Sequence, residues 1–446
     1  MELDTNTYRL SGAGGLGRTA GIIGIIALAV SFIAFFTAPK EGDSGHARAT
    51  ENALHMQAAV ETADAADAAA PVVTDDQAAH KGSDHTIGRT TQFFQSYLNA
   101  FTFWVTVGLG GLFATIVHHL VRATWSVVMR RMYESLMVTL PLLIIFFIPI
   151  ALWGMHDLYH WTHASEASDP IFLKKSAWLS PKFFCLRAVV YFGIWFILAR
   201  LLYSASLKQD EAPSDALSLR MRTISAPGLI LFAVTTTLAA FDWIMSLNYH
   251  WFSTIFGVYI FAGAYLSCTA FCVLVTMYLR SKNILTKEIT DEHYHDMGKW
   301  LFAFVVFWSY IAFSQFFLIW YANLPEETGF FKSRGGSSWM TASLILVICH
   351  FAIPFLFLLS SLTKRSPKAL VIAAVWLLAV HWFDHYWLIA PNFHETFVFS
   401  WLDVTCWLGI GGIFFWNFWR KFTSAPVVPV RDPQLEASIK FANFWV

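Results

Sequence analysis

The sequence contains few charged residues for its length. Asp, Glu, Lys and Arg make up 13% of the 446 residues, whereas 56% are hydrophobic and 17% are aromatic. Soluble domains carry roughly 25% charged residues. A soluble chain of this length would not cover its surface with so few charges, so we expect lipid to contact much of the protein. The formal net charge of zero gives no reason to expect a nucleic acid or another polyanionic partner.

Motifs for redox centres and nucleotides are also absent. No CxxC or CxxCH motif occurs, so disulfides, iron–sulfur ligation and covalently attached haem have no support in the sequence, and we expect no metal ligands. No Walker loop occurs, which argues against nucleotide-driven transport. The five cysteines all fall inside apolar stretches: Cys185, Cys268, Cys272, Cys349 and Cys406.

Long apolar runs are abundant instead. Those long enough to cross a hydrocarbon layer of about 30 Å lie at about 20–38, 97–121, 136–156, 183–203, 224–247, 251–279, 300–321, 339–361, 369–390 and 398–419. They are continuous rather than alternating in hydrophobicity, which indicates helices. The sequence therefore predicts an all-α membrane protein with about ten transmembrane helices.

The distribution of Lys and Arg predicts the orientation of these helices. If the N-terminus is cytoplasmic, more than twice as many of the 30 Lys and Arg residues fall in inner segments as in outer segments, as the positive-inside rule requires. Both termini, including the tail 420–446, are then cytoplasmic. The first run could instead be a signal peptide, because Arg9 and Arg18 precede it. Residues 37–39 lack a small-x-small cleavage site, which favours an uncleaved anchor over 1–38.

The segment 39–96 is the one large extramembrane segment that we expect, on the outer face. It is rich in Ala and Asp, and most of its charged residues are acidic. Such a composition is typical of a disordered or weakly helical chain. We expect a partner protein on the outer face to hold this loop, with a self-packed loop as the alternative.

A first group of ionisable residues lies at the outer ends of predicted helices three to five. An ionisable residue at the centre of a membrane helix costs about 2.5–3.5 kcal/mol, so it needs a partner, water or a function. Two members of opposite charge at similar depth could form an ion pair. The alternative is a quinol headgroup pocket, in which a carboxylate and a histidine accept hydroxyl protons. The group consists of His156, Asp157, Arg187, Asp242 and His250.

A second group lies in predicted helices seven to ten. Three members in helix nine have i, i+3, i+4 spacing and so project from one helix face. We expect the group to form a proton path between the outer surface and the membrane interior, with hydrogen bonding across helices as the alternative. Haem ligation would need two facing histidines at matched depth, such as His350 and His381. The group consists of Gln315, His350, His381, Asp384, His385 and Asp403. The inner half of the membrane contains few ionisable residues that could continue such a path, such as His118 and Glu134.

Two long motifs lie in the middle of the chain. The first covers 241–247 (FDWIMSL) and continues over 250–259 (HWFSTIFGVY). The second covers 299–321 (KWLFAFVVFWSYIAFSQFFLIWY) and continues over 323–328 (NLPEET). Both resemble the ActF membrane subunit of the bacterial alternative complex III. The likeness extends over about 93–420 and is weakest in the outer loop and both tails.

That family is similar to the NrfD/polysulfide-reductase membrane subunits. The resemblance implies two four-helix bundles, 97–247 and 251–390, flanked by the first helix and by the last, 398–419. It implies an assembly in the bacterial inner membrane that oxidises quinol and passes electrons to a cytochrome c or a terminal oxidase. The implied partners are multihaem and monohaem cytochrome c subunits, an iron–sulfur subunit and a second NrfD-like subunit. That second subunit is usually credited with the principal quinol site, so the first polar group here is a quinone pocket or the remnant of one.

These features together predict a membrane subunit of a quinol-oxidising respiratory complex. It would scaffold redox subunits and conduct protons, while haem and iron–sulfur centres belong to the partners. A quinone such as menaquinone, and lipids, are its expected noncovalent ligands. Two alternatives are an autonomous secondary transporter and a purely structural anchor. Broken helices at repeat-related midplane positions would favour a transporter, and the sequence contains no evident pair of them.

Overall fold

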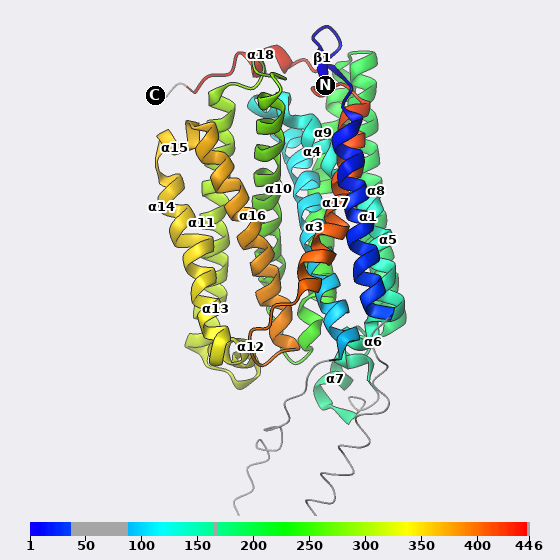
Figure 1. Ribbon diagram of the computed structural model, residues 1–446, viewed down its shortest axis with the longest axis vertical. Coiled ribbons are helices and arrows are strands. Elements are labelled where there is room, and N and C mark those ends of the chain that lie inside the picture. Colours follow the sequence, from blue (N-terminus) through cyan, green and yellow to red (C-terminus); the bar gives the residue numbers. More distant parts are fainter. Residues whose placement is uncertain (37–87, 164–167, 444–446) are drawn as a thin grey trace, which may run out of the picture.

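The chain folds as a bundle of long helices that run side by side along one axis (Figure 1). This computed structural model describes residues 1–36, 88–163 and 168–443. Within those ranges, nine helices are long and apolar enough to cross a membrane. The one sheet there is a small antiparallel hairpin of β1 (Glu2–Asp4) and β2 (Arg9–Ser11). The protein is therefore an all-α, multi-pass membrane protein, as the apolar runs predicted.

The long elements begin and end at typical capping and turn residues. Proline occupies the first turn of several of them, where its missing N–H is not needed, and α11 and α17 each begin with a capping box. These elements are α1 (Gly14–Phe36), α3 (Arg89–Leu120), α4 (Val127–Met137) with α5 (Leu140–Pro149), α8 (Pro181–Glu211), α9 (Asp215–Trp243), α10 (Phe256–Ser281), α11 (Asp291–Ala322), α13 (Ser337–Val347) with α14 (Ile353–Leu359), α16 (Pro367–Ile389) and α17 (Trp401–Ser424).

Shorter elements complete the spans and connect their ends. Two π-helical turns interrupt long elements, at η2 (Ile150–Gly154) and η6 (Ile348–Ala352). The remaining short helices are η1 (Thr124–Ser126), α6 (Met155–Leu158), η3 (His160–Thr162), α7 (Pro170–Lys175), η5 (Met245–Asn248), α12 (Pro325–Gly335), α15 (Ser361–Arg365), η7 (Ala390–Asn392) and α18 (Leu435–Ile439).

Helices α3 and α10 form the centre of the bundle. In their most apolar windows 89% and 83% of the residues are buried, against 22–50% in the other spans. Helix α3 packs against α4, α9, α10, α16 and α17. A methyl group at Gly110 would lie 2.2 Å from the carbonyl oxygen of Ala264, so glycine is required for the approach of α3 to α10. A helix buried on all sides can carry polar groups that never face lipid.

The last long helix, α17, corresponds to the predicted span 398–419. In the described part of the chain, it is the one predicted span that is not apolar enough to count as a candidate membrane-crossing helix. Its sequence is rich in tryptophan and glycine, which are weakly hydropathic, and contains Asp403 and Asn417. It nevertheless runs beside α1 through the bundle (Figure 1). The expectation of about ten helices therefore corresponds to nine apolar spans plus α17.

The two ends of the chain meet at one end of the bundle. The hairpin β1–β2 and helix α18 lie together at the top of Figure 1. Val427 donates its backbone N–H to the carbonyl of Tyr8 at 2.9 Å. Asp432 forms an ion pair with Arg130 of α4 at 2.5 Å. The segment after α17 thus fastens the N-terminal hairpin to α4.

The predicted boundary of the outer loop is wrong at its C-terminal side. Helix α3 begins at Arg89 rather than near residue 97, so 89–96 are helical. Gln95 and Ser96 are buried against other helices, and this packing compensates for their low hydrophobicity. The rest of that loop, 39–87, lies outside the described residues, and so does the predicted contact with a partner.

Candidate functional site

Arg187 and Asp242 of the first polar group form a buried ion pair between α8 and α9. Arg187 donates from Nε to Oδ2 at 2.7 Å and from Nη2 to Oδ1 at 2.8 Å. Asp242, which is 1% exposed, also accepts from Trp178 Nε1 at 2.9 Å and from the Tyr191 hydroxyl at 2.7 Å. A carboxylate accepts about four hydrogen bonds. This one therefore has no acceptor position left for a ligand.

The other members of the first group have different partners near the outer surface. His156 is exposed, and its Nδ1 lies 3.2 Å from the Thr162 hydroxyl. His250 pairs with Asp169 at 2.9 Å, and half of its side chain is exposed. Asp157 is half-buried in the short helix α6. The geometry thus favours the ion-pair interpretation of Arg187 and Asp242 over a common quinone pocket.

Asp384 is the central carboxylate of the second group, and it is held by neutral donors. It lies on α16 and is 2% exposed. Trp308 Nε1 of α11 donates to Oδ2 at 3.1 Å, and the Tyr259 hydroxyl of α10 donates to Oδ1. No cation pairs with Asp384 among the described residues. It can therefore take up a proton without breaking an ion pair.

Three buried imidazoles lie on α16 and in the π-helical turn η6. His381 and His385 of α16 place Nε2 at 3.2 and 3.4 Å from the hydroxyl of Thr106 on α3. Their Nδ1 atoms bond no described residue. His350 lies in the π-helical turn η6, stacks on Trp308 with ring centroids 3.8 Å apart, and bonds no described residue through either nitrogen. Such turns are frequent at functional sites.

Asp403 begins a chain of hydrogen bonds that leads to His394, just beyond the C-terminal end of α16. It accepts from Ser96 Oγ at 2.6 Å and from the Ser400 backbone N–H at 2.9 Å. Gln92 Nε2 donates to Ser96 Oγ at 3.1 Å, and Gln92 Oε1 lies 2.9 Å from His394 Nε2. Burial lowers the pKa of His394, so its ring is neutral near pH 7 and donates to the amide. His394 also lines a small surface pocket, which gives this chain access to solvent.

A polar stripe on α3 lies between Asp403 and the histidines. Each member lies three or four residues from another member, so all lie along one face of the helix. All of them except Gln92 are buried. The amide groups of Gln95 and Asn99 bond no described residue, and buried amides of this kind usually bind ordered water. The sequence prediction missed the stripe because uncharged residues do not interrupt an apolar run, although their spacing was visible. The stripe consists of Gln92, Gln95, Ser96, Asn99, Thr102 and Thr106.

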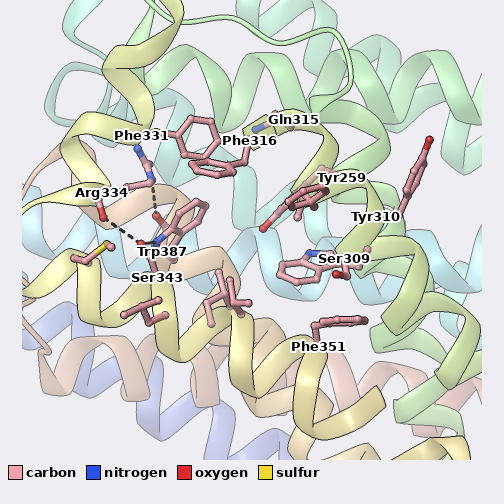
Figure 2. Close-up of a pocket in the computed structure, with 18 of the residues that line it drawn as sticks. Tyr259, Ser309, Tyr310, Gln315, Phe316, Phe331, Arg334, Ser343, Phe351 and Trp387 are labelled. Atoms are coloured by element: carbon pink, nitrogen blue, oxygen red, sulfur yellow. Dashed lines mark hydrogen bonds between the residues drawn. The ribbon is translucent and has the colours of Figure 1, made fainter. Parts of the chain in front are cut away.

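A cavity of about 710 Å³ lies beside Asp384, between α11 and α13. Tyr259 and Trp308, the two donors to Asp384, line it. Gln315, which we expected in the proton path, also lines this cavity and accepts from Ser253 Oγ at 3.2 Å. Figure 2 shows Tyr259 and Gln315 on the same side of the cavity. The cavity therefore reaches Asp384 only through the side chains that bind it.

Arg334 of α12 lies across the cavity from Tyr259 (Figure 2). It is 2% exposed and donates to the backbone carbonyls of Phe330 (2.8 Å), Trp387 (3.2 Å) and Leu388 (2.8 Å). No carboxylate pairs with it in the described part of the chain. The cavity thus has a positive charge at one end and a hydroxyl at the other.

Comparison with known proteins assigns no family to the chain. No protein-family description matches it, and no curated protein matches it either. In the described ranges, no group of three His, Cys, Asp or Glu side chains is arranged to hold a metal ion. The chemistry of the site is therefore argued from its geometry, in which buried carboxyl, imidazole and hydroxyl groups lie beside a cavity.

Proposed function

We propose that the protein is a membrane subunit of a respiratory quinol-oxidising complex, where it conducts protons and scaffolds redox subunits. One observation carries the proposal: buried acid, imidazole and hydroxyl groups from four helices, α3, α10, α16 and α17, extend from Asp384 towards His394. Such groups accept and donate protons directly or through water. Unbonded buried imidazoles cost free energy, so a purely structural anchor gives no reason to keep them.

The proposed path begins at the cavity. The Tyr259 hydroxyl donates to Asp384 and keeps acceptor lone pairs, so a proton received by Tyr259 is passed on to the carboxylate. Asp384 then exchanges its proton with His385, its neighbour on α16, through a bridging water. Thr106 and the polar stripe of α3 lead from the histidine to Asp403. From there the chain of hydrogen bonds continues to the outer surface.

The same cavity is where we propose that a quinol binds, rather than at the saturated ion pair of α8 and α9. Its volume of about 710 Å³ lies within the range of roughly 300–1,000 Å³ for small-molecule sites. Tyr310 and Phe313 on its rim are 64% and 61% exposed, which leaves space for an apolar tail to extend into lipid. A quinol hydroxyl next to Tyr259 gives its proton to the path, and its electrons leave through haem or iron–sulfur centres of partner subunits.

The partners follow from the resemblance of 241–259 and 299–328 to the ActF subunits. They are cytochrome c subunits with several haems or one, an iron–sulfur subunit, a second NrfD-like subunit and a terminal oxidase, in a bacterial inner membrane. The lack of redox motifs in this chain supports an assembly in which other subunits carry the electrons. The excess of Lys and Arg on one side supports cytoplasmic termini.

Replacement of Asp384 by Asn tests the proton path. An amide keeps the shape and can still bond Tyr259 and Trp308, but it cannot take up a proton at neutral pH. We expect proton-coupled turnover to fall by about a hundredfold, the usual contribution of a positioned acid or base. The measurement is quinol oxidation and proton release by the complex in liposomes, with assembly and haem content checked in parallel.

The matched control is Asp291→Asn, because Asp291 is 62% exposed in its side chain and begins α11 at the opposite end of the bundle. We expect this control to retain full turnover. Normal turnover and normal proton release in Asp384→Asn would falsify the proton path through this carboxylate.

A further inference from the structure

A second cavity, of about 540 Å³, lies at the end of the bundle that holds both chain ends. It is formed by the end of α3, the beginning of α9 and the segment before α18. It contains no residue of the proposed proton path or of the quinol cavity. Two of the candidate membrane spans, which contain α3 and α9, end at this cavity.

Buried nitrogen atoms without partners line this cavity. His118 and His119 are 2% and 7% exposed, and Arg130 is 3% exposed. His118 Nδ1, His119 Nε2 and Arg130 Nε bond no described residue. Nε2 of His119 lies 4.0 Å from Glu134 Oε1, which is too far for a hydrogen bond. Buried groups that lack partners cost free energy unless a ligand or water satisfies them.

The charges on the cavity wall favour an anion. Asp432 is neutralised by Arg130 at 2.5 Å. Arg122 and Arg222 form no ion pair among the described residues. The one carboxylate left is Asp215, in the first turn of α9, where the unbonded N–H groups of the helix stabilise negative charge. Two free arginines thus remain to face a ligand.

Arg122 also occupies an unusual backbone position. It directly follows the C-cap of α3 and has a φ of 53°, in the left-handed region. Glycine or asparagine ordinarily takes this position, because other residues are strained there. Arg122 therefore occupies a position where the backbone of an arginine is disfavoured, and its side chain lines the cavity.

The neighbouring surface suits acyl chains rather than water. Leu219, which lines the cavity, is 60% exposed. Farther along α9, Ile230 and Val234 are 68% and 51% exposed. An anion at this cavity that carries two hydrocarbon chains can lay them along α9, whereas a free inorganic anion gains nothing from this apolar surface.

We propose that this cavity binds the phosphate group of an anionic phospholipid, with its acyl chains along α9. The phosphate oxygens accept hydrogen bonds from Arg122, Arg222 and the two histidines, and the arginines match phosphate geometry through paired N–H groups. Lipid sites of this kind form where basic residues gather between membrane helices on the cytoplasmic side.

The test uses the full-length protein in nanodiscs and in a neutral detergent. The variant Arg122→Gln/Arg222→Gln removes the two free cations, and Arg220→Gln is the matched control, because Arg220 is exposed on the same helix and does not line the cavity. Native mass spectrometry measures retained phosphatidylglycerol, and titration with phosphatidylglycerol micelles measures affinity. A basic residue contributes about fivefold to anionic-lipid binding, so the double variant should bind about twenty-fivefold more weakly.

Retention of one phosphatidylglycerol by the wild type and by Arg220→Gln, with loss in the double variant, supports the proposal. Equal retention in all three proteins overturns it. A parallel titration with inorganic phosphate distinguishes the source of the anion. Saturation by phosphate at the affinity of the lipid means a site for a free anion and also overturns the lipid assignment. Quinol turnover does not enter this test, so its outcome is independent of the proposed function.

Discussion

Two of the buried aspartates, Asp242 and Asp384, differ in what binds them. Asp242 accepts two bonds from the guanidinium of Arg187 and two from neutral donors. Asp384 has only the neutral donors Tyr259 and Trp308. A buried carboxylate with a cation is fixed as an anion, whereas one without a cation can exchange protons. At the scale of the residue, this difference is the reason why we propose Asp384, and not Asp242, as a proton carrier.

The ion pair of α8 and α9 predicts a loss of stability rather than of quinol binding. Asp242→Asn leaves Arg187 as an uncompensated buried charge, and breaking such a pair costs about 3–5 kcal/mol. We expect a lower Tm in detergent and an unchanged KM for quinol. The double variant Arg187→Met/Asp242→Leu removes both charges and should recover most of the Tm. A changed KM with an unchanged Tm would restore the quinone-pocket interpretation of this group.

At the scale of the element, α17 is held by close packing on α1 rather than by its own hydropathy. A methyl group at Gly412 would lie 2.5 Å from the carbonyl oxygen of Ala20, and one at Gly24 would lie 2.8 Å from that of Gly409. Only glycines on both helices allow this approach. The contact places Asp403 of α17 beside Ser96 of α3, a hydrogen bond on which the proposed proton path depends.

The α1–α17 contact predicts that Gly412→Leu separates the two helices. Overpacking costs about 1–3 kcal/mol or more, so we expect a lower Tm and faster proteolysis near α17. The matched control is Gly15→Leu, because a side chain at Gly15 has no neighbour within 4 Å. Equal Tm values for the two variants would show that α17 does not depend on this contact.

At the scale of the whole molecule, ion pairs occur towards both ends of the bundle. The end with the proposed proton path holds the pair of Arg187 and Asp242 together with Asp384 and Asp403, which pair with no cation among the described residues. The inner half is richer than the sequence suggested: Arg131 donates to Glu134 at 2.8 Å and to Asp210 at 2.5 Å, and all three side chains are buried. Ion pairs of this kind hold their charges in place, so the proposed proton path does not include them.

The assembly as a whole predicts which molecules co-purify. After gentle solubilisation of the native membrane, haem proteins and a quinone should co-purify with this chain, whereas an autonomous transporter should purify without them.

Ala312→Trp fills the cavity of α11 and α13 and should remove the quinone while haem proteins remain. Ala303→Trp is the control, because Ala303 is exposed on the same helix and does not line the cavity. Mass spectrometry measures the bound quinone, and haem absorbance measures the haem proteins. Quinone retained by Ala312→Trp would exclude this cavity as the quinone site.

The sequence by itself determined the helical membrane fold and the alignment of three polar residues on α16. Both properties are local, because run length sets a span and i, i+3, i+4 spacing sets a helix face. The positions of Arg187 and Asp242 in their apolar runs also predicted that the two residues lie at a similar depth in the membrane. It left open whether they form a pair or a pocket, and it misjudged the beginning of α3, where packing compensates for polarity.

Tertiary structure decided which groups meet. Tyr259 and Trp308 reach Asp384 from helices far apart in the sequence, and Ser96 reaches Asp403 across 307 positions. Such contacts depend on the rotation of each helix about its axis and on the close approaches that glycines allow, and neither can be read from a single sequence. The cavities have the same origin, since they are spaces that the packed helices leave between them.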